Sequence, residues 1–361
     1  MLCFLGACID KSLWIIRCIC ISKLVSLVMK VLDVSGYSFS GKSAIYDLLE
    51  EFDGYCGQGK EFEFDLLRAS GGVLDLEFAL IRNWSPVRSS EAIRRFGILT
   101  RNFGGDGRGL SRLTRLGTYY EKHFPGFESF SKKYLEELCD VEWESYWPFV
   151  YFDAGKMEIF WRKTLARLFR IDTMRSRVVL ARPDAMHFHK VTRSYLRTIF
   201  GNFQRPDCRT LVLNNAFEPF APENSINLFD DARCIVVDRD PRDIYLSALR
   251  AGRVGNTDVG RAVTGETVGD FIARFRIYRC GDYEENPRVL RLRFEDLIEN
   301  YEETVAKILR FLDESPSTHV RKGAIFKPSL SAQGIGQWQK ATGEERIAVK
   351  CIENELQEYC C

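Results

Sequence analysis

The stretch VLDVSGYSFSGKSA, residues 31–44, decides the fold class of this chain. Its apolar start predicts a short strand, and Gly36 to Ser43 spell G-x-x-x-x-G-K-S, the glycine spacing of a phosphate-binding loop. Residues 44–52 then carry apolar side chains at helical spacing. A strand, a glycine-rich loop and a helix in this order predict an α/β fold with a nucleotide site after the first strand.

The loop offers several groups that suit a phosphate. Backbone N–H groups at the start of a helix point toward an anion, and the helix dipole favours negative charge there. Lys42 adds a point charge and Ser43 adds a hydroxyl. The residues predicted to bind the ligand in this loop are Gly36, Ser40, Gly41, Lys42, Ser43 and Ala44.

The composition describes a folded globular protein whose charges almost cancel. Among 361 residues, 51 Lys and Arg face 50 Asp and Glu. No overall field therefore draws the chain to nucleic acid, and any anion site has to be built locally. The 12 cysteines form no C-x-x-C pair. In so long a chain this scatter predicts mostly reduced, buried thiols rather than a disulfide framework.

The N-terminus is apolar but does not read as a clean membrane span. Residues 12–32 are interrupted by Arg17, Lys23 and Lys30, whereas a spanning helix needs about 20 residues with few or no charges. We therefore expect residues 1–28 to be an extension, or Met29 to be the natural start. A cytoplasmic location follows, with membrane anchoring through residues 12–32 as the alternative.

The remaining chain predicts a three-layer, parallel-sheet fold in one domain, residues 29–361. Buried strands are expected at 210–213, 234–237 and 288–294, and a further short strand at 61–68. Residues 74–203 are rich in arginine, aromatic residues and helical patterns. They predict a large helical insertion that could form a substrate subdomain.

A second phosphate site is predicted where the strand at 234–237 ends. Arg239 follows that strand, Pro241 suits the first turn of a helix, and Ser247 lies eight positions after Arg239. The guanidinium fork fits a phosphate, and the serine can donate one more hydrogen bond. Together with the loop, this pair suits a ligand phosphorylated at both its 5′ and its 3′ end. The alternative is a set of surface ion pairs.

These motifs, in this order, resemble those of the PAPS-dependent sulfotransferases, whose donor is 3′-phosphoadenosine-5′-phosphosulfate. VVDRDPRDIYLS, residues 236–247, fits that family's R-x-P-x-D-x-x-x-S segment, and LRLRFEDLIENYEETVAKILRFL, residues 290–312, resembles its strand and helix after the nucleotide site. Gly336 and Trp338 match its G-x-W loop, which closes over the nucleotide. The resemblance covers about half of the chain and leaves the helical insertion unmatched.

The resemblance implies transfer of a sulfuryl group from PAPS to a hydroxyl or amine, without a required metal. The expected acceptor is a carbohydrate. The family loop carries Lys or Arg where this chain has Phe39, so Lys42 is the candidate for that charge. Some carbohydrate sulfotransferases use a glutamate as general base, and Glu218 is the candidate here. His187 and His189 are the runners-up, since alternation on a strand would place both imidazoles on one face.

Two other functions remain open at this point. A kinase using ATP and Mg²⁺ would need Ser43 and a distant aspartate at the metal, and Asp238 ends an apolar strand. A catalytically silent nucleotide-binding protein is also compatible with the missing charge at Phe39. The sequence indicates neither the acceptor nor the oligomeric state.

Overall fold

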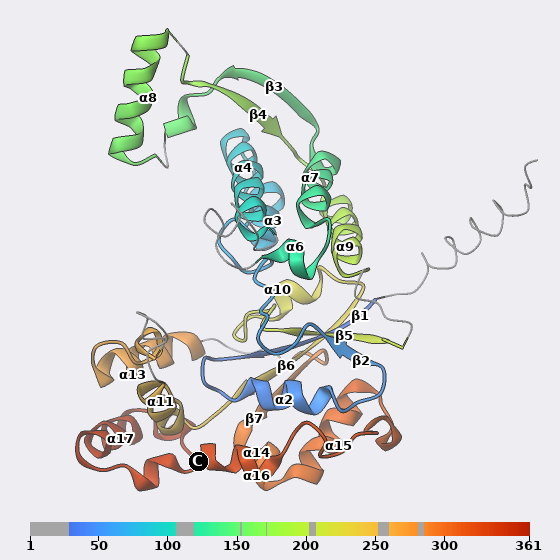
Figure 1. Ribbon diagram of the computed structural model, residues 1–361, viewed down its shortest axis with the longest axis vertical. Coiled ribbons are helices and arrows are strands. Elements are labelled where there is room, and N and C mark those ends of the chain that lie inside the picture. The colour runs from blue at the N-terminus through green and yellow to red at the C-terminus, as the bar shows by residue number, and fades with distance from the viewer. Residues whose placement is uncertain are drawn as a thin grey trace, which may run out of the picture.

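The computed structural model describes residues 29–105, 119–151, 154–170, 172–201, 207–251, 260–280 and 285–361. Their centre is one sheet of five strands in the order β2-β5-β1-β6-β7, and every neighbouring pair in it is parallel (Figure 1). The strands are β1 (Lys30–Gly36), β2 (Tyr55–Gly57), β5 (Thr210–Asn214), β6 (Asp231–Asp238) and β7 (Val289–Arg293). The predicted α/β fold with a parallel sheet is confirmed.

Helices cover both faces of the sheet because its central strands are apolar on both sides. In β1, Leu32 and Val34 face one layer, while Val31 faces the other. The first layer consists of α2 (Lys42–Leu49), α14 (Phe294–Glu299), α15 (Tyr301–Leu312) and α16 (Pro328–Ser331). Beside the sheet, a third apolar cluster joins α11 (Pro241–Arg250), α12 (Arg261–Thr264), α13 (Val268–Arg279) and α17 (Gly343–Glu355).

The predicted insertion, residues 74–203, forms the upper part of the molecule in Figure 1. Its helical body consists of α3 (Val73–Glu77), η1 (Phe78–Arg82), α4 (Pro86–Phe103), α6 (Tyr120–His123), α7 (Phe127–Leu138) and α9 (Ala185–Gly201). From this body projects an arm made of β3 (Val141–Tyr146), η2 (Pro148–Tyr151), α8 (Lys156–Phe169) and β4 (Arg175–Leu180). β3 and β4 pair as an antiparallel hairpin, which the sequence patterns did not indicate.

Short elements complete the described chain. Between β5 and β6 lies α10 (Glu223–Ile226). The C-terminal part adds η3 (Pro316–Thr318), η4 (Ala332–Gly334), η5 (Gln337–Lys340) and η6 (Gln357–Tyr359). These last turns bring the C-terminal segment back to the carboxyl ends of β6 and β7, where the predicted site lies.

The strand predicted at residues 61–68 is wrong. This segment is a series of turns, and the second strand in chain order is β2, which pairs with β5 at the edge of the sheet. The alternating pattern arises for another reason, because Phe64 is buried in the core below the upper helices while Glu63 faces the loop. Leu66 and Leu67 are both buried, which strict alternation does not allow.

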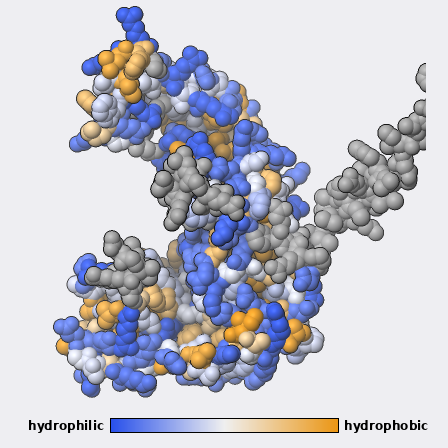
Figure 2. Space-filling view, in the orientation of Figure 1, coloured by the Kyte–Doolittle hydropathy of each residue, from blue (hydrophilic) through white to orange (hydrophobic). Residues whose placement is uncertain are grey.

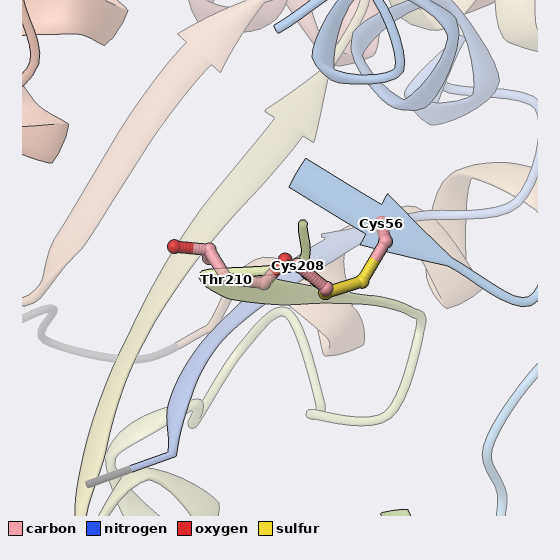
Figure 3. Close-up of a disulfide and its surroundings, with 3 residues drawn as sticks. All are labelled: Cys56, Cys208 and Thr210. Atoms are coloured by element: carbon pink, nitrogen blue, oxygen red, sulfur yellow. Dashed lines mark hydrogen bonds between the residues drawn. A yellow bond between two sulfur atoms is a disulfide. The ribbon is translucent and has the colours of Figure 1, made fainter. Parts of the chain in front are cut away.

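A disulfide joins Cys56 and Cys208, so the prediction of mostly reduced thiols is wrong for this pair (Figure 3). Cys56 lies in β2, and Cys208 lies just before β5, near Thr210. The bond closes a loop across 152 positions of sequence and ties the edge strand to its neighbour. Such a cross-link restricts the unfolded chain, typically by about 2–4 kcal/mol.

Residues 1–28 lie outside the described residues, and so does most of the predicted anchor at 12–32. Among the helices that are described, none is both long enough and apolar enough to span a membrane.

Candidate nucleotide site

The loop between β1 and α2 has the geometry of an anion-binding turn. Gly41 adopts a left-handed φ of 85°, and a Cβ at this position would lie 2.3 Å from the Phe294 ring, so only glycine fits. Gly41 caps α2 without a side-chain hydrogen bond, and the first turn of α2 holds no acidic residue. The first turn of α2 therefore contributes no carboxylate of its own to the positive end of the helix dipole.

Phe39 occupies the position where a basic residue would be expected. Its φ of 61° is in the left-handed region, which is unusual for a bulky residue. Its side chain packs against the third apolar cluster, as does that of Trp338. The carbonyl oxygen of Phe39 accepts a hydrogen bond from Nη1 of Arg239 at 3.0 Å. The loop thus contacts the second predicted phosphate site through its backbone.

Arg239 and Ser247 converge on one short segment of the C-terminal chain. The guanidinium of Arg239 donates to the carbonyl oxygen of Gly334, and the side chain is largely buried. The side-chain nitrogen Nε2 of Gln337 donates to the same carbonyl at 3.2 Å and to Oγ of Ser247 at 3.1 Å. Arg239 therefore contacts the glycine loop directly, and Ser247 is connected to Arg239 through Gln337 and Gly334.

Oγ of Ser40 and Nε of Arg239 are buried and have no hydrogen-bond partner among the residues that the structure describes. A buried donor without a partner is costly, typically about 1–3 kcal/mol, and is therefore rare. One of these atoms lies in the loop and the other at the end of β6. The unsatisfied polar atoms therefore lie at the two places where the sequence predicts phosphate groups.

The remaining predicted ligands, Gly336 and Trp338, are held against α11. Their backbone N–H groups donate to the two carboxylate oxygens of Asp243, at 2.8 Å and 3.3 Å. The Trp338 ring stacks under the guanidinium of Arg242, 3.7 Å from ring centre to Cζ. Arg242 itself forms a buried ion pair with Asp240 at 2.7 Å. The C-terminal loop is thereby fixed beside the helix that carries Ser247.

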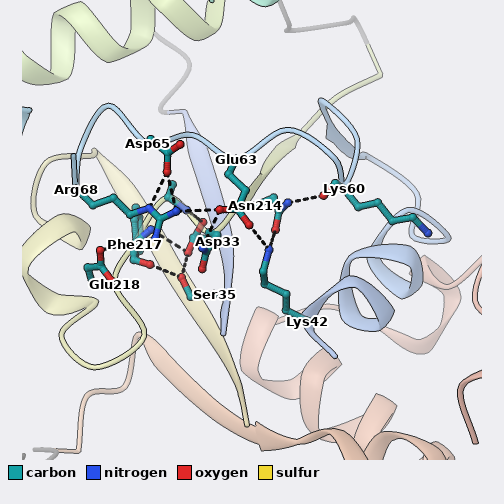
Figure 4. A network of polar contacts seen from close by, with 12 residues as sticks. Asp33, Ser35, Lys42, Lys60, Glu63, Asp65, Arg68, Asn214, Phe217 and Glu218 are labelled. Carbon is teal, nitrogen blue, oxygen red and sulfur yellow. Dashed lines mark hydrogen bonds and ion pairs between the residues drawn. The ribbon is translucent and has the colours of Figure 1, made fainter. Parts of the chain in front are cut away.

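Lys42 points from α2 into a network of polar side chains at the ends of β1 and β5 (Figure 4). Its Nζ donates to Oε1 of Glu63 at 2.7 Å and to Oδ1 of Asn214 at 2.8 Å. Glu63 also accepts from Arg68 at 2.8 Å and from Asn215 at 3.1 Å. Sequence reasoning missed Glu63 and Arg68, which have no motif of their own.

Glu218 lies on the other side of Arg68, with Oε1 3.7 Å from Nη1 of that arginine. Burial raises the pKa of Glu218, and the nearby Asp65 and Glu63 raise it further, against the opposing charge of Arg68. Burial also tends to raise the pKa of Glu63, but the contacts with Lys42, Asn215 and Arg68 outweigh it and lower the pKa. The two carboxylates thus differ in basicity, with Glu218 the stronger base.

Asp33 holds the segment that precedes Glu218. It is fully buried in β1 and accepts from the N–H groups of Ala216 at 2.8 Å and Phe217 at 3.2 Å, and from the hydroxyl of Ser35. Burial raises the pKa of Asp33 to about 6, although these hydrogen bonds oppose the shift. Asn215, in the same segment, has a left-handed φ of 54°. A turn held by Asp33 therefore presents Glu218.

The two histidines lie apart from this network, in α9 of the upper lobe. The prediction of a strand here is wrong, and two residues two positions apart on a helix do not share a face. His187 is exposed at the start of the helix, while His189 has Nε2 3.4 Å from Oε1 of Glu77. Within the residues that the structure describes, no cluster of three or more His, Cys, Asp or Glu could hold a metal.

Asp238, the candidate metal ligand of a kinase, is engaged by an arginine. Its two oxygens accept from Arg279 at 2.5 Å and 2.9 Å, and one of them also accepts from the backbone N–H of Arg239. The Arg279 guanidinium lies 3.8 Å from the ring centre of Tyr37. This carboxylate therefore neutralises an arginine beside the loop.

Part of the chain matches the sequence model of a known family. Residues 161–317 match the sequence model described as "Sulfotransferase family". That range contains β5, β6, β7, Arg239 and Ser247, while the glycine loop and Glu63 lie before it. No curated protein matches the chain significantly.

Solved structures similar to this chain are distant. Sulfotransferase STF1 from Mycobacterium tuberculosis H37Rv is 14% identical, with 91% of this chain and 81% of that chain covered and a TM-score of 0.36. Sulfotransferase STF9 from Mycobacterium avium is 13% identical, with 96% and 80% covered and a TM-score of 0.34. Retinol dehydratase, in complex with androsterone and inactive cofactor PAP, is 11% identical, with 93% and 83% covered and a TM-score of 0.33.

Scores this low add no argument about activity, so the assignment depends on the sequence match and on the observed fold. The matched region supplies three of the five sheet strands and the helix that carries Ser247. Residues 161–317, which lie in a parallel α/β sheet with a glycine loop after its first strand, are similar to the sulfotransferase family.

Proposed function

We propose that this protein transfers the sulfuryl group of PAPS to a hydroxyl or amine acceptor, with a carbohydrate as the expected acceptor class. The proposal is carried by a set of hydrogen bonds that connects the two predicted phosphate sites. Arg239 donates to the carbonyl of Phe39 in the glycine loop and to that of Gly334. Gln337 donates to Gly334 as well and to Ser247. A bisphosphorylated nucleoside has phosphates on both sides of its ribose. Two anion sites this close suit such a ligand better than they suit ATP.

Each end of the donor has its own set of residues in this proposal. The N–H groups of Gly41, Lys42 and Ser43, with the hydroxyls of Ser40 and Ser43, bind the 5′ end, and Gly36 leaves room for the turn. The N–H of Ala44, which was also predicted to bind there, donates to the carbonyl oxygen of Gly41 at 3.0 Å. Arg239 and Ser247 bind the 3′-phosphate. Gly336 and Trp338 cover the nucleotide from the C-terminal side, held there by Asp243.

When bound, PAPS supplies an electrophilic sulfur and a bisphosphate leaving group. Transfer of this kind depends on positioning and on stabilisation of developing charge. Lys42 stabilises the negative charge that grows on the leaving oxygen. Glu218, with its raised pKa, accepts the proton of the acceptor hydroxyl, while Glu63 and Asn214 hold Lys42 in place. None of these steps requires a metal.

Isothermal titration calorimetry tests the donor assignment. The intact protein should bind 3′,5′-adenosine bisphosphate at least tenfold more tightly than ATP with Mg²⁺, and EDTA should leave that binding unchanged. Preference for ATP with Mg²⁺ would overturn the proposal in favour of a kinase. Tight binding of the bisphosphate, without sulfuryl transfer to any of a panel of mono- and oligosaccharides or amines, would indicate a silent nucleotide-binding protein.

The base is tested by Glu218→Gln, with Glu63→Gln as the matched variant. If Glu218 is the base, its glutamine variant should lose about 10²–10⁴ in kcat while still binding the bisphosphate. In the parent enzyme, activity should then fall with decreasing pH at a pKa above the ordinary value of glutamate, since the base acts only when ionised.

Glu63 is the alternative base because it is the carboxylate in direct contact with Lys42. In that case Glu63→Gln would show the larger loss, and the acid limb of the pH profile would lie below the ordinary glutamate pKa. Normal turnover in Glu218→Gln would remove Glu218 from the mechanism. His187→Gln and His189→Gln test the runners-up, and we expect both variants to stay active.

We further propose that residues 29–361 act as a single domain in which residues 74–203 form the acceptor side. The upper helices pack on the sheet face that includes Val31 and Leu211, on which Phe64 also packs. A cytoplasmic location stays a prediction. The Cys56–Cys208 disulfide speaks against a reducing compartment, where such bonds rarely persist.

A further inference from the structure

Helix α8 at the end of the arm exposes its apolar side chains instead of burying them. No residue of α8 is buried. Met157, Trp161, Leu165 and Leu168 follow one another at intervals of four, four and three positions, which places them on one stripe of the helix. They are 66%, 56%, 45% and 70% exposed. Figure 2 shows hydrophobic residues gathered at the end of this arm.

The other side of α8 is strongly cationic. Lys156, Lys163 and Arg167 lie about 135° around the helix from the apolar stripe at 100° per residue, with the exposed Phe160 beside them. Arg170 follows directly after the helix. All four are exposed. The acidic residue in α8 is Glu158, which pairs with Arg162 at 2.7 Å. Among the described residues these four cations have no ion-pair partner, so the helix combines an exposed apolar face with positive charge, although the whole chain is nearly neutral.

We propose that α8 is a membrane-surface helix that docks on a bilayer containing anionic lipids. An interfacial helix buries Trp, Phe and Leu at the headgroup boundary and directs Lys and Arg toward lipid phosphates and carboxylates. Charge complementarity selects this occupant, since a neutral apolar partner would leave the cations without a counterpart. The arm carries α8 away from the sheet (Figure 1).

The hairpin that supports α8 has the rigidity this role needs. β3 and β4 pair over six positions, from Val141 opposite Leu180 to Tyr146 opposite Arg175. The charges on the hairpin are paired across its strands, with Arg177 bonded to Glu142 and Arg175 3.4 Å from Glu144. The uncompensated positive charge of the arm is therefore concentrated on α8.

Vesicle co-sedimentation with the full chain tests the proposal. We expect binding to vesicles of phosphatidylcholine with about 30% phosphatidylserine, and at least tenfold weaker binding to pure phosphatidylcholine. Trp161→Glu/Leu165→Glu should reduce binding at least tenfold. The double variant Lys163→Gln/Arg167→Gln should reduce vesicle binding by about 25-fold. Raising the salt concentration should also weaken vesicle binding by the parent protein.

Matched control variants come from α17, which is also exposed. Ile347 is 67% exposed, so Ile347→Glu places a charge on a comparable apolar side chain, and Arg346→Gln/Lys350→Gln removes two exposed cations. Neither should change vesicle binding. All variants should keep the parent's affinity for 3′,5′-adenosine bisphosphate, which shows that they are folded.

Three results would overturn the proposal. The first is absence of binding to the anionic vesicles. The second is equal binding by the parent and both α8 variants. The third is a dimer seen by analytical ultracentrifugation without lipid and lost in Trp161→Glu/Leu165→Glu, which would assign the apolar stripe to a second copy of this chain.

Discussion

Replacing Arg239 by alanine should weaken binding of 3′,5′-adenosine bisphosphate by about 30- to 150-fold. Hydrogen bonds to charged groups contribute about 1.5–3 kcal/mol each, and a loss of about 2–3 kcal/mol corresponds to this range in Kd. Arg239 is largely buried, so its charge is little screened by solvent. Burial lowers the pKa of this guanidinium, and a bound phosphate would reverse that shift. Calorimetry at constant ionic strength measures the effect.

The loss should be specific to the 3′-phosphate. Adenosine 5′-phosphate, which lacks that group, should bind the parent and Arg239→Ala with similar affinity. Arg239→Lys should recover only part of the loss, because an ammonium lacks the planar fork. Arg346→Ala, at an exposed position of α17, is the control and should bind like the parent. Equal affinity of Arg239→Ala and the parent for the bisphosphate would contradict the proposed 3′-phosphate site.

Arg239 also donates to the carbonyls of Phe39 and Gly334, so its removal affects more than the ligand. Thermal unfolding of Arg239→Ala without ligand separates the two contributions. A variant that keeps its melting temperature and loses bisphosphate binding would locate the effect in the site. A lower melting temperature with unchanged binding would make Arg239 a structural link between β6, the loop and the C-terminal segment.

The sequence predicted the parts of this site that depend on local rules. Gly41 can be recognised because the turn into α2 needs a left-handed φ that glycine adopts without strain. Pro241 marks the first turn of α11, and Asp240 before it accepts from the N–H of Arg242 as a helix cap. Apolar runs at 210–213 and 234–237 predicted buried strands of a parallel sheet. Each of these signals lies within a few residues of the feature that it specifies.

What the sequence did not predict depends on contacts between distant segments. Glu63 reaches Lys42 because turns, and not a strand, follow β2, while the E-F-E-F pattern around it has the period of a strand. The partners Cys56 and Cys208 lie 152 positions apart and meet only because β2 pairs with β5. The hairpin of β3 and β4 interrupts a region whose composition favours helices. Long-range pairing decides all three.

Replacing Lys42 by methionine should lower kcat by about 10²–10³ while changing the affinity for 3′,5′-adenosine bisphosphate by less than about fivefold. Loss of one group that stabilises charge only in the transition state typically has this effect on kcat. Methionine keeps the length of the side chain and much of its packing against the loop. Single-turnover kinetics with PAPS, together with calorimetry of the bisphosphate, separate the two quantities.

The contact between Lys42 and Glu63 makes this prediction distinguishable from a structural effect. Without the lysine, Glu63 keeps Arg68 and Asn215 but loses the charge that contributes most to lowering its pKa. The pKa of Glu63 should therefore rise in Lys42→Met. Relative to the parent, this variant should lose less stability at acidic pH than at neutral pH, because a protonated carboxyl no longer needs a positive partner. Glu63→Gln/Lys42→Met should recover stability at neutral pH without recovering kcat. Recovery of both would show that Lys42 acts only by neutralising Glu63.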